Sequence, residues 1–470
     1  MTDKYHVPVK ITPPRFQPIG KYSIIEFRED CAGSCKKCVK KNCIYNNFSY
    51  NRKHISDMKE PEYLYTCSGC FRCVQECTKG IFSRVINPEY RTLGDDYWRA
   101  DIILKLWYQA HTGNIPVSGS GYGGPFIGEG FDSVWTDMSE IVRPTRDGIH
   151  GREYINTCFE LSERFKGLSF NDNMTLAKKP RKILEVPLPL LLNLPKNLII
   201  NKYTILAAAK AASILKTFLL IDSKNYTPNL SKYKNNLIPC LKTDELKKYK
   251  NLIVTSKAVL IEYTNTQDII RTVSCIRSLS RNKTVIIKVP LNTNADKIAS
   301  ELADEDVDTI YFYADDHGKE LNTKNPLFLK DIIRKIHNRL VADLTRQNIN
   351  LIFSGGIAMA EHVAKAIIFG ADAAVADIPT MIAMECRFCK ECQKGYSCPV
   401  KLDEEFDSDW GAARIANLFG AWHGQLLEVM GAMGIREARR LRGEIGRSIR
   451  FENLEKDIFE PIFKRHSEQL

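Results

Sequence analysis

Short runs rich in β-branched and aromatic residues alternate with amphipathic helical stretches from about residue 180 to residue 378, and this alternation is typical of an α/β fold. The clearest helical stretches are 266–281 and 358–371. Eight strand–helix units predict a (βα)8 barrel, whereas a doubly wound open sheet would need a topological switch point that the sequence does not show. The expected strands are 182–187, 217–222, 236–241, 258–263, 284–290, 309–315, 350–356 and 373–378.

A serine and two glycines end the seventh expected strand, in the stretch FSGGIAMAEHVAKAI (353–367). Glycine lets a backbone approach a ligand closely, and the free amides at the start of the following helix suit a phosphate group. In barrels of this kind the phosphate site often follows strands seven and eight. Ser354, Gly355 and Gly356 are therefore a candidate phosphate site, and a tight strand-to-helix turn is the competing interpretation.

Twelve of the fifteen cysteines fall into three groups of four. Closely spaced triplets can wrap one side of an iron–sulfur cubane while a more distant cysteine closes the other side. Zinc is the rival, but zinc ribbons use paired rather than triple cysteines, so the spacing favours iron–sulfur. The remaining Cys158, Cys240 and Cys275 are expected to be small buried side chains. The three groups are Cys31, Cys35, Cys38 and Cys43; Cys67, Cys70, Cys73 and Cys77; and Cys386, Cys389, Cys392 and Cys398.

The composition of the 470 residues limits which partners and which cellular location we expect. The net charge of +11 is spread along the whole chain, and no basic patch interleaved with aromatic residues indicates nucleic acid. No secretory signal opens the sequence, and the most apolar run, 203–221, contains two lysines and is expected to be a buried helix leading into a strand rather than a membrane span. We expect a cytoplasmic protein whose many cysteines bind metal rather than form disulfides.

The stretch SGGIAMAEHVAKAIIFGADAAVADIPTMIAMECRFCKECQKGYSCPV, with the later AWHGQLLEVMGAMGIREARRLRG, resembles the C-terminal part of the glutamate synthase FMN domain. The resemblance implies a TIM-type (βα)8 barrel that holds FMN beside an iron–sulfur cluster. It implies that Ser354, Gly355 and Gly356 hold the FMN phosphate and that Lys288 approaches the flavin. Three of the third group's cysteines match the family's cluster ligands, and Cys389 is an addition that would allow a 4Fe-4S cluster.

The first two cysteine groups resemble a two-cluster ferredoxin module, with a long loop between the groups and without the usual prolines. That resemblance implies one cluster on Cys31, Cys35, Cys38 and Cys77, and a second on Cys67, Cys70, Cys73 and Cys43. We therefore expect three iron–sulfur clusters. The expected division is a ferredoxin-like iron–sulfur region (1–97), a segment leading into the barrel (98–181), the barrel with its cysteine motif (182–400) and a helical tail (401–470).

Four loops depart from the family pattern. The family has small or glycine-rich loops after strands one, two, four and six, and this chain has bulkier residues there. Those glycines let backbone lie against the flavin ring and 2-oxoglutarate, so much of this site is expected to be lost or rebuilt. Glutamate synthesis therefore does not follow from the resemblance. The four replacements are 187–197, 221–229, 262–268 and 314–320.

An arginine cluster lies in the segment before the barrel, with Arg143, Arg146 and Arg152 close together in sequence. Arginine forks suit a small acidic substrate, and structural ion pairs are the competing interpretation. The basic stretch 436–450 is expected to be a helix, either solvated or docked on an acidic partner.

Two functions remain open. The first is an iron–sulfur flavoprotein that passes electrons from the N-terminal clusters through the third cluster to FMN. The second is an electron-transfer or scaffold subunit of a larger redox complex, whose barrel has lost flavin and catalysis. Both require a redox partner protein or further subunits, and the sequence identifies no catalytic residue.

Overall fold

The computed structural model describes residues 5–16, 19–26, 70–115, 128–137, 154–162, 170–175, 183–451 and 458. Its centre is a closed barrel of eight parallel strands, so the predicted barrel is confirmed. The strands join in the order β10-β11-β12-β13-β6-β7-β8-β9, in which each strand pairs with its neighbour in sequence and β13 closes on β6. The barrel strands are β6 (Leu190–Leu192), β7 (Leu219–Asp222), β8 (Leu237–Leu241), β9 (Ala258–Glu262), β10 (Thr284–Pro290), β11 (Thr309–Tyr313), β12 (Asn350–Ser354) and β13 (Ala373–Ala376).

The first expected strand is wrong. Residues 182–187 contribute β5 (Glu185–Val186), which pairs antiparallel with β4 (Phe159–Glu160) outside the barrel ladder. The first barrel strand is instead the three-leucine run at β6, inside the stretch that we expected to be a loop. All three leucines are buried, and flanking prolines keep the strand short.

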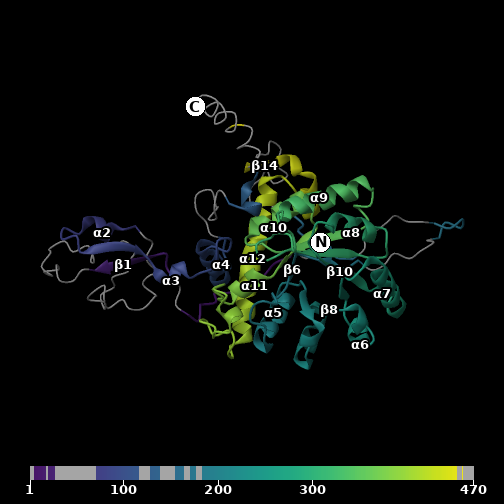
Figure 1. Cartoon of the computed structure of the whole chain (residues 1–470), viewed down its shortest axis with the longest axis horizontal. Coiled ribbons are helices and arrows are strands. Elements are labelled where there is room, and N and C mark those ends of the chain that lie inside the picture. The colour runs from purple at the N-terminus through teal and green to yellow at the C-terminus, as the bar shows by residue number, and fades with distance from the viewer. Residues whose placement is uncertain are drawn as a thin grey trace.

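Helices surround the barrel, and the long α12 packs across α5 and α4 (Figure 1). Between β7 and β8 the connection is a 3-10 segment, Pro228–Asn236, rather than an α-helix. Asn201 caps α5 by accepting hydrogen bonds from the amides of Tyr203 and Thr204. The helices of the barrel region are α5 (Lys202–Ile214), α6 (Lys250–Thr255), α7 (Thr266–Leu279), α8 (Ala295–Ala303), α9 (Leu329–Ala342), α10 (Ala360–Phe369), α11 (Ile378–Ala383) and α12 (Ser408–Ala432), with α4 (Ala100–Thr112) before it.

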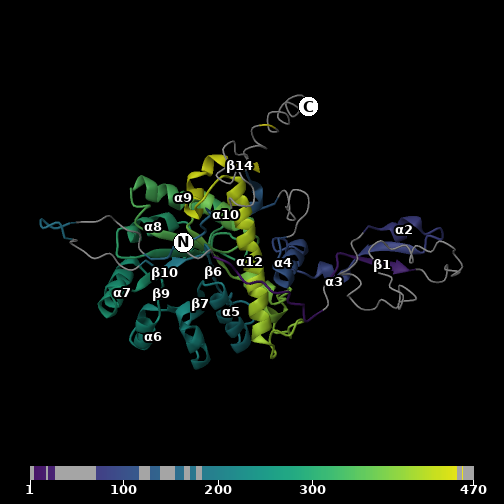
Figure 2. The same cartoon turned by 180° about the vertical axis from the view of Figure 1, so that it is seen from behind.

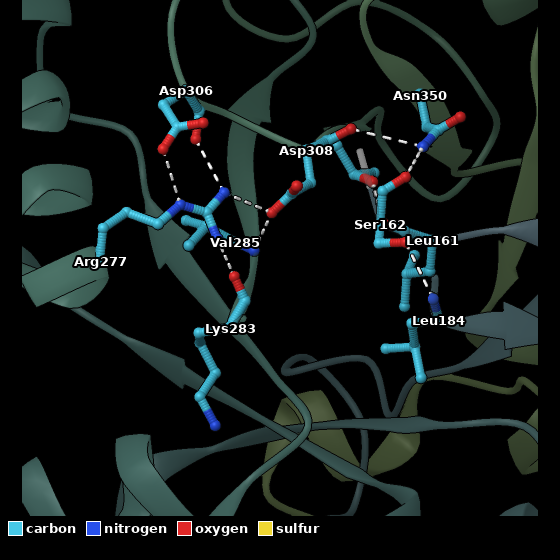
Figure 3. Close-up of polar contacts among 10 residues, drawn as sticks. Leu161, Ser162, Leu184, Arg277, Lys283, Val285, Asp306, Asp308 and Asn350 are labelled. Carbon is cyan, nitrogen blue, oxygen red and sulfur yellow. Dashed lines mark hydrogen bonds and ion pairs between the residues drawn. The ribbon is translucent and has the colours of Figure 1, made fainter. Parts of the chain in front are cut away.

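The interior of the barrel is packed with side chains, as strands buried on both faces require. Residues Phe159, Leu161 and Val186 from the β4–β5 hairpin belong to this interior cluster, so the hairpin plugs the amino-terminal end of the barrel. Hydrogen bonds fix the plug to the neighbouring barrel strands. Asn350 Nδ2 donates to Ser162 O at 2.7 Å (Figure 3). Thr309 Oγ1 donates to Leu161 O at 2.6 Å.

Beside the plug, Arg277 of α7 reaches across two strand ends (Figure 3). Its guanidinium binds the Asp308 carboxylate at 2.7 Å and Asp306 at 3.0 Å, and it also donates to Lys283 O. The Val285 amide donates to the same Asp308 carboxylate at 2.6 Å. These contacts close the amino-terminal face and leave the carboxyl-terminal face for chemistry.

At the N-terminal side, β1 (Tyr22–Glu26) pairs antiparallel with β2 (Phe82–Ile86), and α2 (Arg72–Glu76) packs on β2. This small unit projects from the barrel, and α3 (Pro88–Arg91) connects it to α4 (Figures 1 and 2). The tail is only partly helical, because the basic stretch 436–450 forms two 3-10 turns and then β14 (Ser448–Arg450) instead of the expected helix. The last strand pairs with β3 (Val134–Thr136).

Within the part of the chain that the structure describes, no helix has both the length and the apolar character that crossing a bilayer would need. The apolar run 203–221 forms α5 and the start of β7, as expected.

Candidate functional site: a cysteine loop beside the barrel mouth

The third cysteine group forms a loop between α11 and α12, at the carboxyl-terminal side of the barrel. All four cysteines of the group line one small cavity of about 20 Å³. Leu198 and Ile199, from the loop after β6, line the same cavity, as do Met381 and Val400. The structure thus brings together the four residues that the spacing predicted.

Tight backbone turns make this convergence feasible. Glu385, Phe388 and Lys390 all have positive φ angles, of 74°, 48° and 60°. Each such position costs a residue with a side chain on the order of 1 kcal/mol, and non-glycine residues in this region gather at functional sites. Alternating turns of this kind also point amide groups into a concave surface that suits an anionic cluster.

A described part of the second cysteine group has the same local conformation. Phe71 follows Cys70, has φ 56° and ψ 16°, and immediately precedes the helical turn that contains Cys73. Lys390 follows Cys389 in the same way, with φ 60° and ψ 13°, before the turn that contains Cys392. The described part from Cys70 to Cys73 therefore shares its local backbone conformation with the part from Cys389 to Cys392.

The raised pKa values of the cavity cysteines indicate that thiolates need a positive charge beside them here. Burial is the main reason that the pKa of Cys386 is raised to about 12, and the neighbouring cysteines contribute to the rise. The pKa of Cys392 is raised for the same two reasons, burial and the neighbouring cysteines. Because thiolates are the form that ligates metal, four thiolates can exist together here only with a compensating cation.

A buried donor at the cavity wall also fits an anionic cluster. Arg387 lines the cavity, and its buried Nε has no hydrogen-bond partner among the described residues. A cluster bound by the four cysteines presents sulfur acceptors to such a donor. Among the described residues, no three His, Cys, Asp or Glu side chains lie close enough for one metal ion, and the cysteines surround a cavity instead.

Two residues from the N-terminal part of the chain hold the loop from outside. Arg15 donates from its amide and Nε to Glu385, which precedes the first cysteine, and from Nη2 to Val400 O, which follows the last. Its guanidinium lies 4.5 Å from the ring centre of Trp410 and 5.0 Å from that of Phe406. Arg15 therefore joins the two ends of the cysteine loop.

Asp95 provides the second attachment. Its Oδ2 accepts hydrogen bonds from Lys390 Nζ at 2.7 Å and from His317 Nε2 at 2.9 Å. Burial alone would raise the pKa of Asp95, but these two hydrogen bonds outweigh it and hold the pKa well below its ordinary value. The hydrogen bond to Asp95 correspondingly raises the pKa of His317 above 6.5.

The barrel mouth holds a second cavity, of about 80 Å³, which has room for a few water molecules. Lys288 lines it, and its amine lies 4.7 Å from the ring centre of Tyr313 and makes no hydrogen bond or ion pair with any described residue. Cys240 also lines it, and burial raises the pKa of that thiol to about 12. Lys196 at the rim pairs with Glu262 at 3.4 Å.

The predicted phosphate residues are occupied by contacts within the chain. Ser354 is buried, and its hydroxyl shares a 2.7 Å hydrogen bond with Tyr311. Gly355 and Gly356 have φ angles of +100° and +65°, as a strand-to-helix turn requires, but the loop after β11 packs against both. A Cβ on Gly356 would lie 2.8 Å from backbone atoms of His317 and Gly318. Residues 314–320 therefore fill this space.

A carboxylate stands at the next strand end. Asp377 follows β13, is buried, and accepts a hydrogen bond from the amide of Ile378 at 2.7 Å. Burial raises the pKa of Asp377 to about 6. The carboxyl group of Asp377 therefore lies at the start of α11, beside the strand end where the phosphate was expected.

Residues 250–436 match the family described as the conserved region in glutamate synthase. An archaeal-type glutamate synthase [NADPH] from Thermotoga maritima is 23% identical over 87% of this chain and 90% of its own length. The chain is similar to the glutamate synthase FMN-domain family. The archaeal glutamate synthase [NADPH] of Methanocaldococcus jannaschii is 31% identical over 38% of this chain and 37% of its own length. The archaeal glutamate synthase [NADPH] of Archaeoglobus fulgidus is 23% identical over 89% of this chain and 92% of its own length.

Solved structures with a similar chain trace include a mandelate oxidase mutant with a monooxide FMN adduct, at a TM-score of 0.43 and 12% identity over 74% of this chain and 91% of that chain. A flavocytochrome b2 mutant with pyruvate bound has a TM-score of 0.43 and 11% identity over 76% of this chain and 80% of that chain. The sequence relatives support an FMN-domain-like oxidoreductase for this glutamate synthase relative.

The residues present fit the two expected cofactors unequally. The four cysteines that line one cavity supply the ligand type that an iron–sulfur cluster needs, and Arg387 Nε, which has no hydrogen-bond partner among the described residues, supplies a donor. The phosphate turn does not fit FMN as it stands, because its glycines face backbone rather than open space and Asp377 places a carboxylate nearby. In the described structure an FMN phosphate would have to displace the loop after β11.

Several predicted site residues lie outside the described residues: Cys31, Cys35, Cys38, Cys43, Cys67, Arg143, Arg146 and Arg152. Of the second group, Cys70 is exposed, whereas Cys73 and Cys77 are half-buried. Cys275 is exposed, so its expected burial is wrong, and Cys158 and Cys240 are half-buried. Sequence reasoning missed Arg15, Asp95 and Asp377, since nothing in their own neighbourhoods indicates a site.

Proposed function

We propose that this glutamate synthase relative is an iron–sulfur electron-transfer protein, with a 4Fe-4S cluster held by Cys386, Cys389, Cys392 and Cys398 at the edge of the barrel. The observation that carries the proposal is the single cavity that all four cysteines line. Two further clusters belong to the N-terminal ferredoxin-like region, one on Cys31, Cys35, Cys38 and Cys77 and one on Cys67, Cys70, Cys73 and Cys43. The matching turns at Phe71 and Lys390 support a cluster role for the second group as well.

The protein works with a redox partner or with further subunits in this proposal, because electrons that enter must leave. The proposed regions are unchanged from the sequence prediction: 1–97, 98–181, 182–400 and 401–470. The filled phosphate turn favours a barrel that carries clusters without flavin.

A second candidate is a flavin oxidoreductase that reduces a small acidic substrate. The similarity to glutamate synthases and the unpaired amine of Lys288 at the mouth favour it. In this version Lys288, Ser354, Gly355 and Gly356 contact FMN after the loop at 314–320 has moved. Arg143, Arg146 and Arg152 would bind the acidic substrate, which includes 2-oxoglutarate as the family's own substrate class.

One preparation separates the candidates. Protein purified without oxygen is assayed for iron, acid-labile sulfide and FMN, and its electron paramagnetic resonance (EPR) spectrum is recorded after reduction. About twelve iron per chain without FMN supports three cubanes in an electron-transfer protein, and the same iron with about one FMN supports the flavin candidate. The variant Cys392→Ser should lose about four iron, whereas Cys275→Ser, at an exposed cysteine outside the groups, should lose none. Equal iron in both variants would refute the third cluster.

A further inference from the structure

One short segment connects the N-terminal unit with the cysteine loop. It is residues 89–98, called here the clasp, and it lies between β2 of the N-terminal unit and α4 beside the barrel. Glu89, in α3, pairs with Arg387 at 3.6 Å, and the amide of Gly94 donates to Arg387 O at 3.0 Å. The clasp therefore touches the residue directly after the first cysteine of the loop.

Two further contacts continue along the loop. Trp98 is fully buried, and its ring centre lies 5.8 Å from that of Phe388. Asp95 binds Lys390 at 2.7 Å, with both side chains about one quarter to one third exposed. Thus three of the four residues between the first three cysteines, Arg387, Phe388 and Lys390, contact the clasp.

The clasp is shaped before it reaches the loop. The second carboxylate oxygen of Asp95 accepts from the amides of Tyr97 and Trp98, at 3.0 and 2.9 Å, which closes a tight turn. Gly94 has φ +69°, and a Cβ there would collide with the backbone oxygen of Trp98, so the turn has little freedom. A rigid turn can transmit the position of one unit to the other.

We propose that the clasp docks the N-terminal iron–sulfur unit onto the cysteine loop, and that Asp95 and Lys390 are the positioning residues of this internal interface. The proposal rests on the proposed cluster at the loop. It concerns where the cluster-bearing loop sits against the unit that precedes it. A side chain that positions a metal-binding loop without ligating metal commonly changes metal retention by about tenfold or more.

The test replaces Lys390, because the Asp95 turn stays intact when only the lysine changes. Lys390→Met keeps the length of the side chain and removes the ion pair, and Lys390→Arg restores a cation. The matched control is Asp296→Ala, which breaks an ion pair at 3.0 Å between Asp296 of α8 and the half-exposed Lys335 of α9, away from the clasp. Hydrogen–deuterium exchange of peptides covering 82–98 and 386–400 is measured together with iron release to a chelator and the EPR signal of the reduced protein.

Lys390→Met should speed exchange in both peptides, release iron from the third cluster about tenfold faster and alter its EPR signal. Lys390→Arg should restore all three, and Asp296→Ala should change none. Exchange at 82–98 that stays at the wild-type rate in Lys390→Met overturns the docking role. If the wild-type protein holds no iron at the third cysteine group, the proposed function fails instead, and the exchange result still decides the interface.

Discussion

Gly356 allows a direct test of whether the phosphate turn is filled. Its φ of +65° is unfavourable for alanine by about 1–2 kcal/mol. In addition, a Cβ would meet three backbone atoms of the loop after β11 at 2.8 Å. Backbone atoms cannot rotate away, and forcing a methyl group into a packed site costs about 1–3 kcal/mol more. Gly356→Ala should therefore destabilise the barrel by about 2–5 kcal/mol.

Gly395 provides the matched control. Its φ is +81°, but nothing lies within 4 Å of a Cβ built there. Gly395→Ala should then cost the backbone part alone, about 1–2 kcal/mol. The difference between the two variants isolates the contact with the loop.

The assay is urea unfolding of the metal-free protein, followed by far-ultraviolet circular dichroism. Because a chain of 470 residues need not unfold in one step, the comparison uses the midpoint of the barrel transition at constant slope. Equal midpoints for Gly356→Ala and Gly395→Ala would refute the packing argument. The turn would then be open, and the flavin candidate would gain.

Three further predictions follow from the charged groups. Asp372→Ala should cost about 3–5 kcal/mol in thermal or urea unfolding, because Arg346 at 2.9 Å and Arg442 at 3.1 Å lose a carboxylate that is only 2% exposed. The pKa of Asp377 is about 6 in the folded protein, against an ordinary value of 3.8 in the unfolded chain. Its contribution to stability is therefore complete below pH 3.8 and is lost as the pH rises through 6. Asp377→Asn should reduce the fall in unfolding free energy between pH 4 and pH 7 by roughly 2–3 kcal/mol, as urea unfolding at each pH would show. Arg15→Ala should speed iron release from the third cluster, with no change in the N-terminal EPR signals, as chelator challenge would show.

The barrel was predictable because each strand carries its own local signal. From β7 to β13 the strands are short, mostly apolar runs that begin within two residues of the predicted positions. The first strand was missed because prolines flank a run of three leucines, which also fits a bulky loop. Its identity depends on closing the barrel between β7 and β13, which is a property of the whole sheet.

The cysteine loop was predictable from spacing, and its surroundings were not. The cysteine pattern spans thirteen residues, whereas Arg15 and Glu385 are 370 positions apart and Asp95 and Lys390 are 295 apart. A sequence pattern also indicates that Gly356 takes a left-handed turn, but it cannot show whether a ligand or another loop faces that turn. Here a loop does.

The clasp and the filled turn are parts of one structure. Tyr97 donates its hydroxyl hydrogen to Gly356 O at 2.5 Å, and Trp98 Nε1 donates to Asp316 O at 2.7 Å. The segment that holds the cysteine loop through Asp95 thus also holds the loop after β11 against the glycines. A phosphate could reach Gly356 only by moving the loop at Asp316, which would break the Trp98 contact and disturb the clasp. If added FMN does not bind to the wild-type protein, hydrogen–deuterium exchange at 82–98 should therefore stay unchanged. If FMN binds at the turn, exchange at 82–98 should rise with occupancy, and binding without that rise would contradict the coupling.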